Sequence, residues 1–193
     1  MSLPHILLGL LRQPASGYDL KNTVDEYVRH FWPAELSQIY PTLKRLQAQG
    51  WLSVRSEPSA KGPERRVYET TEAGHGELQR WLRSGPQVGS ERFAYLAQIA
   101  FMDELGSLEE ARRFMVTLRA RLIAQRAGLE MLEAGWAQEW PNFPHDLPET
   151  EFYPHINLRM GLLSLAAKIQ WCDESIERID ARLELQEKTE PLP

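Results

Sequence analysis

Polar and basic side chains recur between residues 35 and 50 at a helical spacing. The apolar positions follow one another at three- and four-residue steps: Leu36, Ile39, Leu43 and Leu46. At about 100° per residue, the opposite face carries Ser37, Gln38, Pro41, Lys44, Arg45 and Ala48, with Tyr40 on its flank. Hydroxyls, an amide and cations suit base edges and phosphate oxygens, whereas nothing there resembles an acid–base pair. The stretch predicts a helix that contacts DNA.

Each of these side chains also has a plainer interpretation. Lys44 and Arg45 are either phosphate contacts or solvated helix charges, and their shared face with Ser37 and Gln38 favours phosphate. Gln38 either pairs with an adenine edge or is an exposed amide. Tyr40 either offers its hydroxyl to a phosphate or belongs to the rim of the core.

A second basic group follows in an expected hairpin. Residues 51–56 and 65–70 alternate like strands, and residues 58–63 between them are rich in turn formers. The hairpin places Lys61, Arg65 and Arg66 at or near its tip. These cations either protect an edge strand from aggregation or contact the DNA backbone. The nearby helix face favours backbone contact.

The elements before and after complete a small domain. We expect a buried helix over residues 3–12, a second helix capped by Ser16, the helix just described, the hairpin, and a further helix from residue 72. Pro41 is tolerated only near the start of its helix. This order predicts a winged helix-turn-helix domain over residues 1–84.

Residues 84–90 form a plausible linker, and the remainder is predicted helical. We expect a short helix over about 91–105, a long helix from Ser107, a connection over 136–150 because it holds three prolines, and a last helix. That helix carries an a/d-like apolar seam, predicted as the dimer interface: Leu158, Leu162, Leu165, Ile169, Cys172, Ile176, Ile179 and Leu183. The predicted fold is therefore mainly α with a small β-wing, its winged helix followed by an all-helical, coiled-coil-like dimerisation domain over residues 85–193.

Charge and composition narrow the class of protein. The chain has 193 residues and a net charge of -5, but residues 1–84 hold 11 Lys and Arg against 9 Asp and Glu, so the acidity lies in the back half. A single cysteine, Cys172, allows no internal disulfide and suits a reducing compartment. The apolar run at residues 6–11 is too short to span a membrane. We expect a cytoplasmic protein.

The remaining candidate sites are weaker. Five aromatic residues of the back half either line a pocket for an aromatic effector or belong to the core and interface: Trp136, Trp140, Phe152, Tyr153 and Trp171. Cys172 lies on the seam and is expected to be an inert buried thiol. The five histidines show no metal-ligand spacing, and no nucleophile motif or phosphate loop occurs. We predict no metal, no cofactor and no enzymatic activity.

Several motifs together resemble the PadR-like family of transcriptional regulators. They are the SGYDL run at 16–20, SQIYPTLKRL at 37–46, GWL at 50–52 and RVYETTEAG at 66–74, and residues 159–179 around Trp171 are similar to the family's helical C-terminal region. Nearly the whole chain is covered; the proline-rich residues 136–150 are the least similar part.

The resemblance implies a homodimeric repressor whose paired helices enter the major grooves of a palindromic operator in double-stranded DNA. It assigns Ser37, Gln38, Tyr40, Pro41, Thr42 and Lys44 to the DNA-facing helix, and Lys61, Gly62, Arg65 and Arg66 to the wing. It also implies a possible response to small aromatic or hydrophobic effectors. The alternative is a winged-helix protein-interaction module without specific DNA binding.

Overall fold

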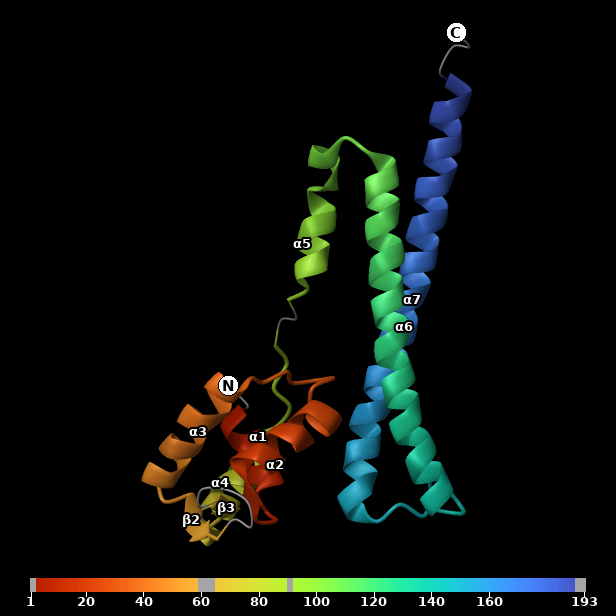
Figure 1. Ribbon diagram of the computed structural model, residues 1–193. Coiled ribbons are helices and arrows are strands. Elements are labelled where there is room, and N and C mark those ends of the chain that lie inside the picture. Colours follow the sequence, from red (N-terminus) through yellow and green to blue (C-terminus); the bar gives the residue numbers. More distant parts are fainter. Residues whose placement is uncertain (1–2, 59–64, 90–91, 190–193) are drawn as a thin grey trace. The chain divides into compact units, whose positions relative to one another are not determined.

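The computed structural model describes residues 3–58, 65–89 and 92–189. It contains two compact units, Met1–Gly89 and Ser90–Pro193, and the division falls within the expected linker. The chain is mostly helical with one small antiparallel sheet, which confirms the predicted fold class (Figure 1).

The first unit packs four α-helices around a three-stranded sheet. Its elements are α1 (Leu3–Leu10), β1 (Ala15–Ser16), α2 (Gly17–Thr23), a π-helical turn (Val24–Val28), α3 (Leu36–Ala48), β2 (Leu52–Glu57), β3 (Arg65–Thr70) and α4 (Glu72–Arg83). The strand order is β1-β3-β2, all antiparallel. The two-residue strand β1 was not predicted; it pairs Ala15 with Tyr68 of β3. Its brevity leaves no alternation in the sequence to detect.

The core of this unit lies between α1, α2 and α3. The completely buried side chains are Leu7, Leu8, Leu11, Val24, Ile39, Leu43 and Leu46. Thr70, at the end of β3, ties the sheet to α1, because its hydroxyl donates to the carbonyl of Leu8 at 2.9 Å and its amide donates to the carbonyl of Leu11 at 2.9 Å. Gly74 packs so closely that an added Cβ would lie 2.3 Å from the carbonyl oxygen of Trp51.

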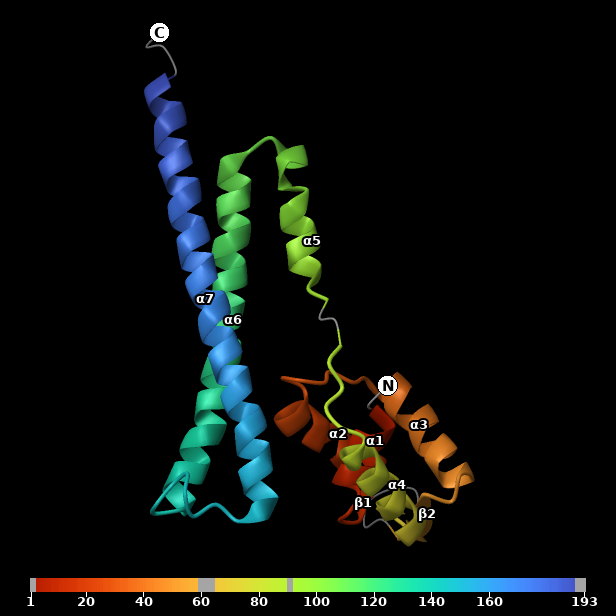
Figure 2. The same cartoon turned by 180° about the vertical axis from the view of Figure 1, so that it is seen from behind.

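The second unit is dominated by a helical hairpin. It comprises α5 (Ala94–Ala100), a 3-10 turn (Met102–Leu105), α6 (Leu108–Glu139) and α7 (Glu149–Thr189). Figures 1 and 2 show α6 and α7 running side by side in opposite directions. Ser107 caps α6, since its hydroxyl accepts from the amide of Glu110 at 3.2 Å. The connection between α6 and α7 is shorter than predicted, because α6 continues through Trp136 to Glu139 and α7 already begins at Glu149.

The apolar seam of α7 packs on α6 of the same chain. Leu158, Leu162, Leu165 and Cys172 are buried against Met115, Leu122 and Leu129, and Ile169, Ile176 and Ile179 are partly buried there. Leu183 is half-buried. The four buried side chains are therefore covered within the chain, and the assignment of the seam to a dimer interface stays a prediction. The sequence pattern shows that a helix has an apolar seam, but the same spacing serves a partner within the chain or in another subunit.

Candidate nucleic-acid interface

Helix α3 presents one buried and one exposed face. Ile39, Leu43 and Leu46 are completely buried, which confirms most of the predicted stripe, while Leu36 at the first helical position is 43% exposed. The exposed face carries the predicted polar and basic side chains: Ser37, Gln38, Tyr40, Pro41, Lys44 and Arg45. Gly50 has a φ of 73°, the left-handed conformation expected just beyond the helix end.

Two side chains of α3 form hydrogen bonds with backbone groups of their own helix or its N-cap. The side-chain oxygen of Gln38 accepts from the amide of Glu35 at 3.2 Å, which satisfies one of the free amides at the helix start. Thr42 is 8% exposed, and its hydroxyl donates to the carbonyl of Gln38 at 2.7 Å. The structure therefore contradicts the expectation that Thr42 faces DNA. Three residues after Ile39 and one before Leu43, Thr42 lies at the edge of the buried stripe.

A hollow of about 370 Å³ opens beside the exposed face of α3. Its lining residues come from α3, from the start of α2 and from β3: Ser16, Gly17, Tyr18, Asp19, Tyr40, Arg65, Arg66 and Tyr68. The ring of Tyr40 lies against Gly17, where an added Cβ would come within 2.7 Å of its Cε1 atom. Any larger residue at position 17 would displace that ring, so glycine fixes where the Tyr40 hydroxyl points.

Tyr18 is a further candidate that the reasoning from sequence missed. Its side chain is 71% exposed and lines the same hollow as Tyr40. An exposed tyrosine offers a hydroxyl to phosphate and a flat ring to a sugar or base. Helix α2 starts at Gly17, directly after the predicted Ser16 cap, and the exposure of Tyr18 places its side chain on the solvent side of this helix.

The two arginines at the start of β3 are held by neighbouring elements. Arg65 forms an ion pair with Asp19 of α2, and the Nη2 atom of Arg66 donates to the Oε1 atom of Gln47 of α3 at 3.2 Å. The guanidinium of Arg66 also lies 5.5 Å from the centre of the Tyr68 ring. Arg65 is thereby paired with α2 and Arg66 with α3. Lys61 and Gly62, the other predicted wing residues, lie outside the described residues.

Asp19 stays ionised at this position. Burial raises the pKa of its carboxyl group, but hydrogen bonds from the Ser16 hydroxyl and amide and the charge of Arg65 outweigh burial and hold the pKa below its usual value. The Oδ2 atom accepts from Ser16 Oγ at 2.9 Å and from Ser16 N at 3.1 Å. The carboxylate thus caps α2 and binds Arg65 with the same oxygen.

The structure does not bring the five predicted effector residues together. Trp136 donates to Glu151 at 3.0 Å and its ring contacts His155, whereas Trp171 contacts Tyr95. Phe152 and Tyr153 are exposed, and Trp140 is half-buried. On a helix rising about 1.5 Å per residue, Tyr153 and Trp171 are roughly 27 Å apart. These five residues therefore do not line one pocket within this chain.

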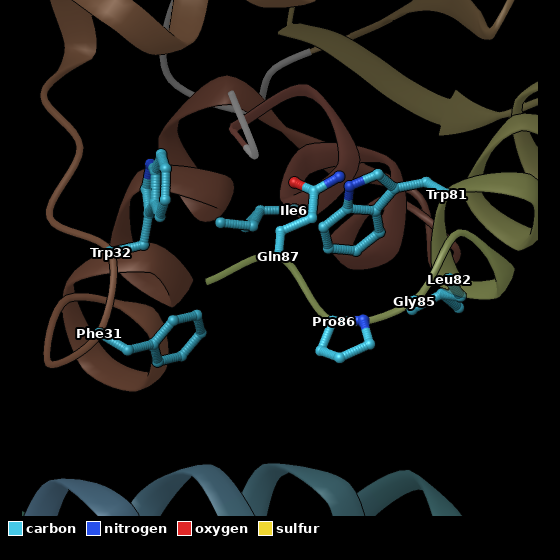
Figure 3. A pocket seen from close by; sticks show the side chains of 8 residues that line it. All are labelled: Ile6, Phe31, Trp32, Trp81, Leu82, Gly85, Pro86 and Gln87. Carbon is cyan, nitrogen blue, oxygen red and sulfur yellow. The ribbon is translucent and has the colours of Figure 1, made fainter. Parts of the chain in front are cut away.

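An apolar cavity of about 470 Å³ occurs instead within the first unit. It is lined by Ile6, Phe31, Trp32, Trp81, Leu82, Gly85, Pro86 and Gln87. Figure 3 shows Trp32 and Trp81 on opposite sides of it, with Ile6 between them. His5 stacks on the ring of Trp81 at 4.7 Å. The lining comes from three separate segments of the chain, so the cavity could not be predicted from a local sequence pattern.

Other kinds of site find no support in the described part of the chain. No group of three or more His, Cys, Asp or Glu side chains among these residues could hold a metal ion. Cys172 is fully buried, and burial together with the charge of Asp173 raises the pKa of its thiol. Across residues 3–58, 65–89 and 92–189, every helix is too short or too polar to span a membrane.

Comparison with known proteins covers both units. The profile of the transcriptional regulator PadR-like family matches residues 6–80, and that of the virulence activator alpha C-terminal region matches residues 91–180. The negative transcriptional regulator PadR of Bacillus subtilis is 28% identical over 181 residues, covering 92% of this chain and 97% of that protein.

Solved structures of the same Bacillus subtilis protein are also similar. Its crystal structure in complex with operator DNA aligns with a TM-score of 0.74 at 25% identity, covering 93% of this chain and 99% of that one. Its complex with p-coumaric acid aligns with a TM-score of 0.68 at 26% identity, with coverage of 93% and 99%. Sequence and fold agree with one another: residues 6–80 carry the domain of the PadR-like family of transcriptional regulators, and the whole chain is similar to a member of that family.

Proposed function

We propose that this chain is a repressor that binds a palindromic operator as a homodimer, with α3 in the major groove and the β2–β3 hairpin beside the phosphate backbone. The observation that carries the proposal is the exposed face of α3, which continues into a hollow lined by two tyrosines and two arginines. The relative that was crystallised with operator DNA shares this domain order.

The residues of this face divide by their chemistry. Gln38, near the start of α3, is the candidate for base readout, since the first residues of a recognition helix approach base edges. Ser37, Lys44 and Arg45 present a hydroxyl and cations to phosphates. Pro41 is exposed between them and supplies apolar contact. Tyr18, Tyr40, Arg65 and Arg66 surround the hollow, where a phosphate would find hydroxyl and guanidinium donors.

Dimerisation is assigned to a second face of α7. Phe152, Ile156, Met160 and Leu163 follow one another at four- and three-residue steps and are 43% to 63% exposed, whereas the seam on the other side of the helix is buried. A row of large apolar side chains left in water is characteristic of an interaction surface. A second copy of the chain would cover this row and hold two α3 helices about one turn of DNA apart.

The test is selection of duplexes from a random pool with the purified protein, followed by binding measurements on the recovered sequence. We expect a palindrome, and Gln38→Ala should lower the preference for particular base pairs by about 1 to 3 kcal/mol each. Gln79→Ala, on the exposed side of α4, is the matched control and should change nothing. Recovery of no preferred sequence would refute operator binding.

We also propose that a small aromatic effector releases the DNA, as the relative's complex with p-coumaric acid suggests. The apolar cavity beside Trp32 and Trp81 is large enough for one aromatic ring with a short substituent. p-Coumaric acid is the probe, and both tryptophan emission and operator affinity are followed during its titration. Trp81→Leu should abolish the response, whereas Trp140→Leu should not. Unchanged operator affinity at saturating p-coumaric acid would exclude this compound as an effector.

A further inference from the structure

The hollow beside Tyr40 contains a negative charge at a place where a DNA-binding surface is expected to be positive. Among its eight lining residues Asp19 is the one acid, and it shares the hollow with the exposed residues Tyr18 and Tyr40 and the two arginines of β3. The side chains of Asp19 and Arg65 are 40% and 49% exposed, so both groups can be reached from solvent.

Asp19 is held in this position from two directions. Ser16 donates to its Oδ2 atom through both its hydroxyl and its amide, at 2.9 and 3.1 Å, and Arg65 donates to the same atom from β3. The carboxylate cannot swing away without uncapping α2, whereas the guanidinium of Arg65 stands on a long flexible side chain. If one partner of this ion pair moves, it is Arg65.

A carboxylate and a phosphate offer an arginine the same kind of charged oxygen acceptor. Asp19 therefore occupies the donors that a DNA phosphate would use, and its charge repels a phosphate that approaches the hollow. An exposed ion pair contributes only about 0 to 1 kcal/mol, so a phosphate held in the right place can replace the carboxylate.

We propose that Asp19 is a specificity-determining residue: it retains Arg65 in complexes with non-operator DNA and yields Arg65 only when base contacts by α3 fix a phosphate at the hollow. This inference rests on the proposed DNA-binding function. Binding to non-operator DNA is almost entirely electrostatic, and its affinity follows the number of available cations. Withholding one cation from that complex widens the gap between operator and non-operator affinity.

The decisive variant is Asp19→Asn, whose amide oxygen still accepts from Ser16 while the charge is lost. Binding is measured by fluorescence anisotropy from 50 to 200 mM KCl, on the duplex recovered by selection and on a shuffled duplex of the same composition. We expect affinity for the shuffled duplex to rise about fivefold at the lowest salt, its salt slope to steepen by about one, and operator affinity to rise twofold or less.

Asp25→Asn is the matched control, since it makes the same change in net charge within the same unit. Asp25 pairs with Lys21 and Arg29 and does not line the hollow. It should leave the ratio of operator to shuffled affinity unchanged. An equal fall in this ratio for Asp19→Asn and for Asp25→Asn would show a general charge effect and overturn the inference.

The charge-neutral double variant Asp19→Asn with Arg65→Gln gives an independent test, also if Asp19→Asn alone folds poorly. Removing the pair should leave shuffled-duplex affinity within twofold of wild type and weaken operator binding about tenfold. A loss of the same size on both duplexes would mean that Arg65 contacts every DNA, contrary to the inference. Wild-type protein that bound no duplex at all would refute the proposed function and this inference together, whereas selective wild-type binding with an unchanged Asp19→Asn ratio would refute the inference alone.

Discussion

Helices α3 and α7 both carry an apolar seam against the rest of their own unit, but they differ in what the other side of the helix presents. Opposite its buried stripe, α3 exposes hydroxyls, an amide and cations. Opposite its seam, α7 exposes a second apolar row that includes Met160 and Leu163. A helix with one apolar face buries all of its apolar surface within its own unit, and its polar face remains free to bind a charged ligand. A helix with two apolar faces requires a second protein surface.

The largest effect should come from placing a charge on the second face of α7. Leu163→Glu would bury an unpaired carboxylate in the proposed dimer contact, so we expect a monomer in sedimentation velocity and a loss of operator affinity of about a hundredfold, because two half-sites no longer bind together. Asn157→Glu makes a similar change on an exposed side of α7 away from that row and is the control. A Leu163→Glu protein that still sediments as a dimer would show that this face of α7 is not the dimer contact.

A neighbouring pair of leucines sharpens the difference between the two faces of α7. Leu162 is 5% exposed and packs on α6, whereas Leu163 is 60% exposed. Leu162→Ala should lower the free energy of unfolding by about 2 to 5 kcal/mol, since it leaves a cavity in the seam. Leu163→Ala should cost less than about 1 kcal/mol in the dissociated chain. Urea denaturation at low protein concentration measures both, and equal costs would contradict the assigned orientation.

The polar side of α3 can be perturbed without changing a charge. An added Cβ at Gly17 would collide with the ring of Tyr40, so Gly17→Ala should displace its hydroxyl and weaken operator binding about tenfold. Gly76→Ala in α4 is the control, because nothing lies within 4 Å of its added Cβ. That variant should keep full affinity and gain about 0.5 to 1 kcal/mol of stability from helix propensity. Unchanged affinity for Gly17→Ala would mean that Tyr40 makes no contact with DNA.

The smallest effect concerns an exposed ion pair between the two long helices. The hydrogen bond from Arg112, at 2.5 Å, lowers the pKa of Asp180. A lowered carboxyl pKa stabilises the folded chain above the unfolded pKa of about 4, and this contribution is lost as the pH falls through the folded value. The difference in urea midpoint between wild type and Asp180→Asn should therefore shrink as the pH falls below about 4. A difference that stays constant with pH would exclude this pair as its source.

Much of the fold could be predicted because the three- and four-residue spacing of apolar side chains identifies the buried face of a single helix. The steps from Ile39 to Leu46 specify one stripe, and Gly50 marks where its helix ends. The sequence pattern could not specify which partner covers a stripe, so the seam around Leu162 was assigned to a second subunit although α6 covers it.

The candidate site was predictable at the level of a face and less so at the level of single residues. By its spacing Thr42 lies at the edge of the polar face. Only the structure shows that its hydroxyl donates to the Gln38 carbonyl within the same helix. Tyr18 was missed because α2 has only seven residues, too few for the apolar spacing to show which of its side chains are exposed. The ion pair of Arg65 with Asp19 joins positions 46 residues apart, which no local pattern records.

The most direct test of the central claim is the stoichiometry and spacing of the DNA complex. Sedimentation of wild-type protein with the selected palindrome should give two chains per duplex, and inserting five base pairs between the half-sites should abolish tight binding, because it turns one half-site to the other side of the helix. One chain per duplex, or an affinity that ignores the insertion, would contradict a dimer that places two copies of α3 in successive major grooves.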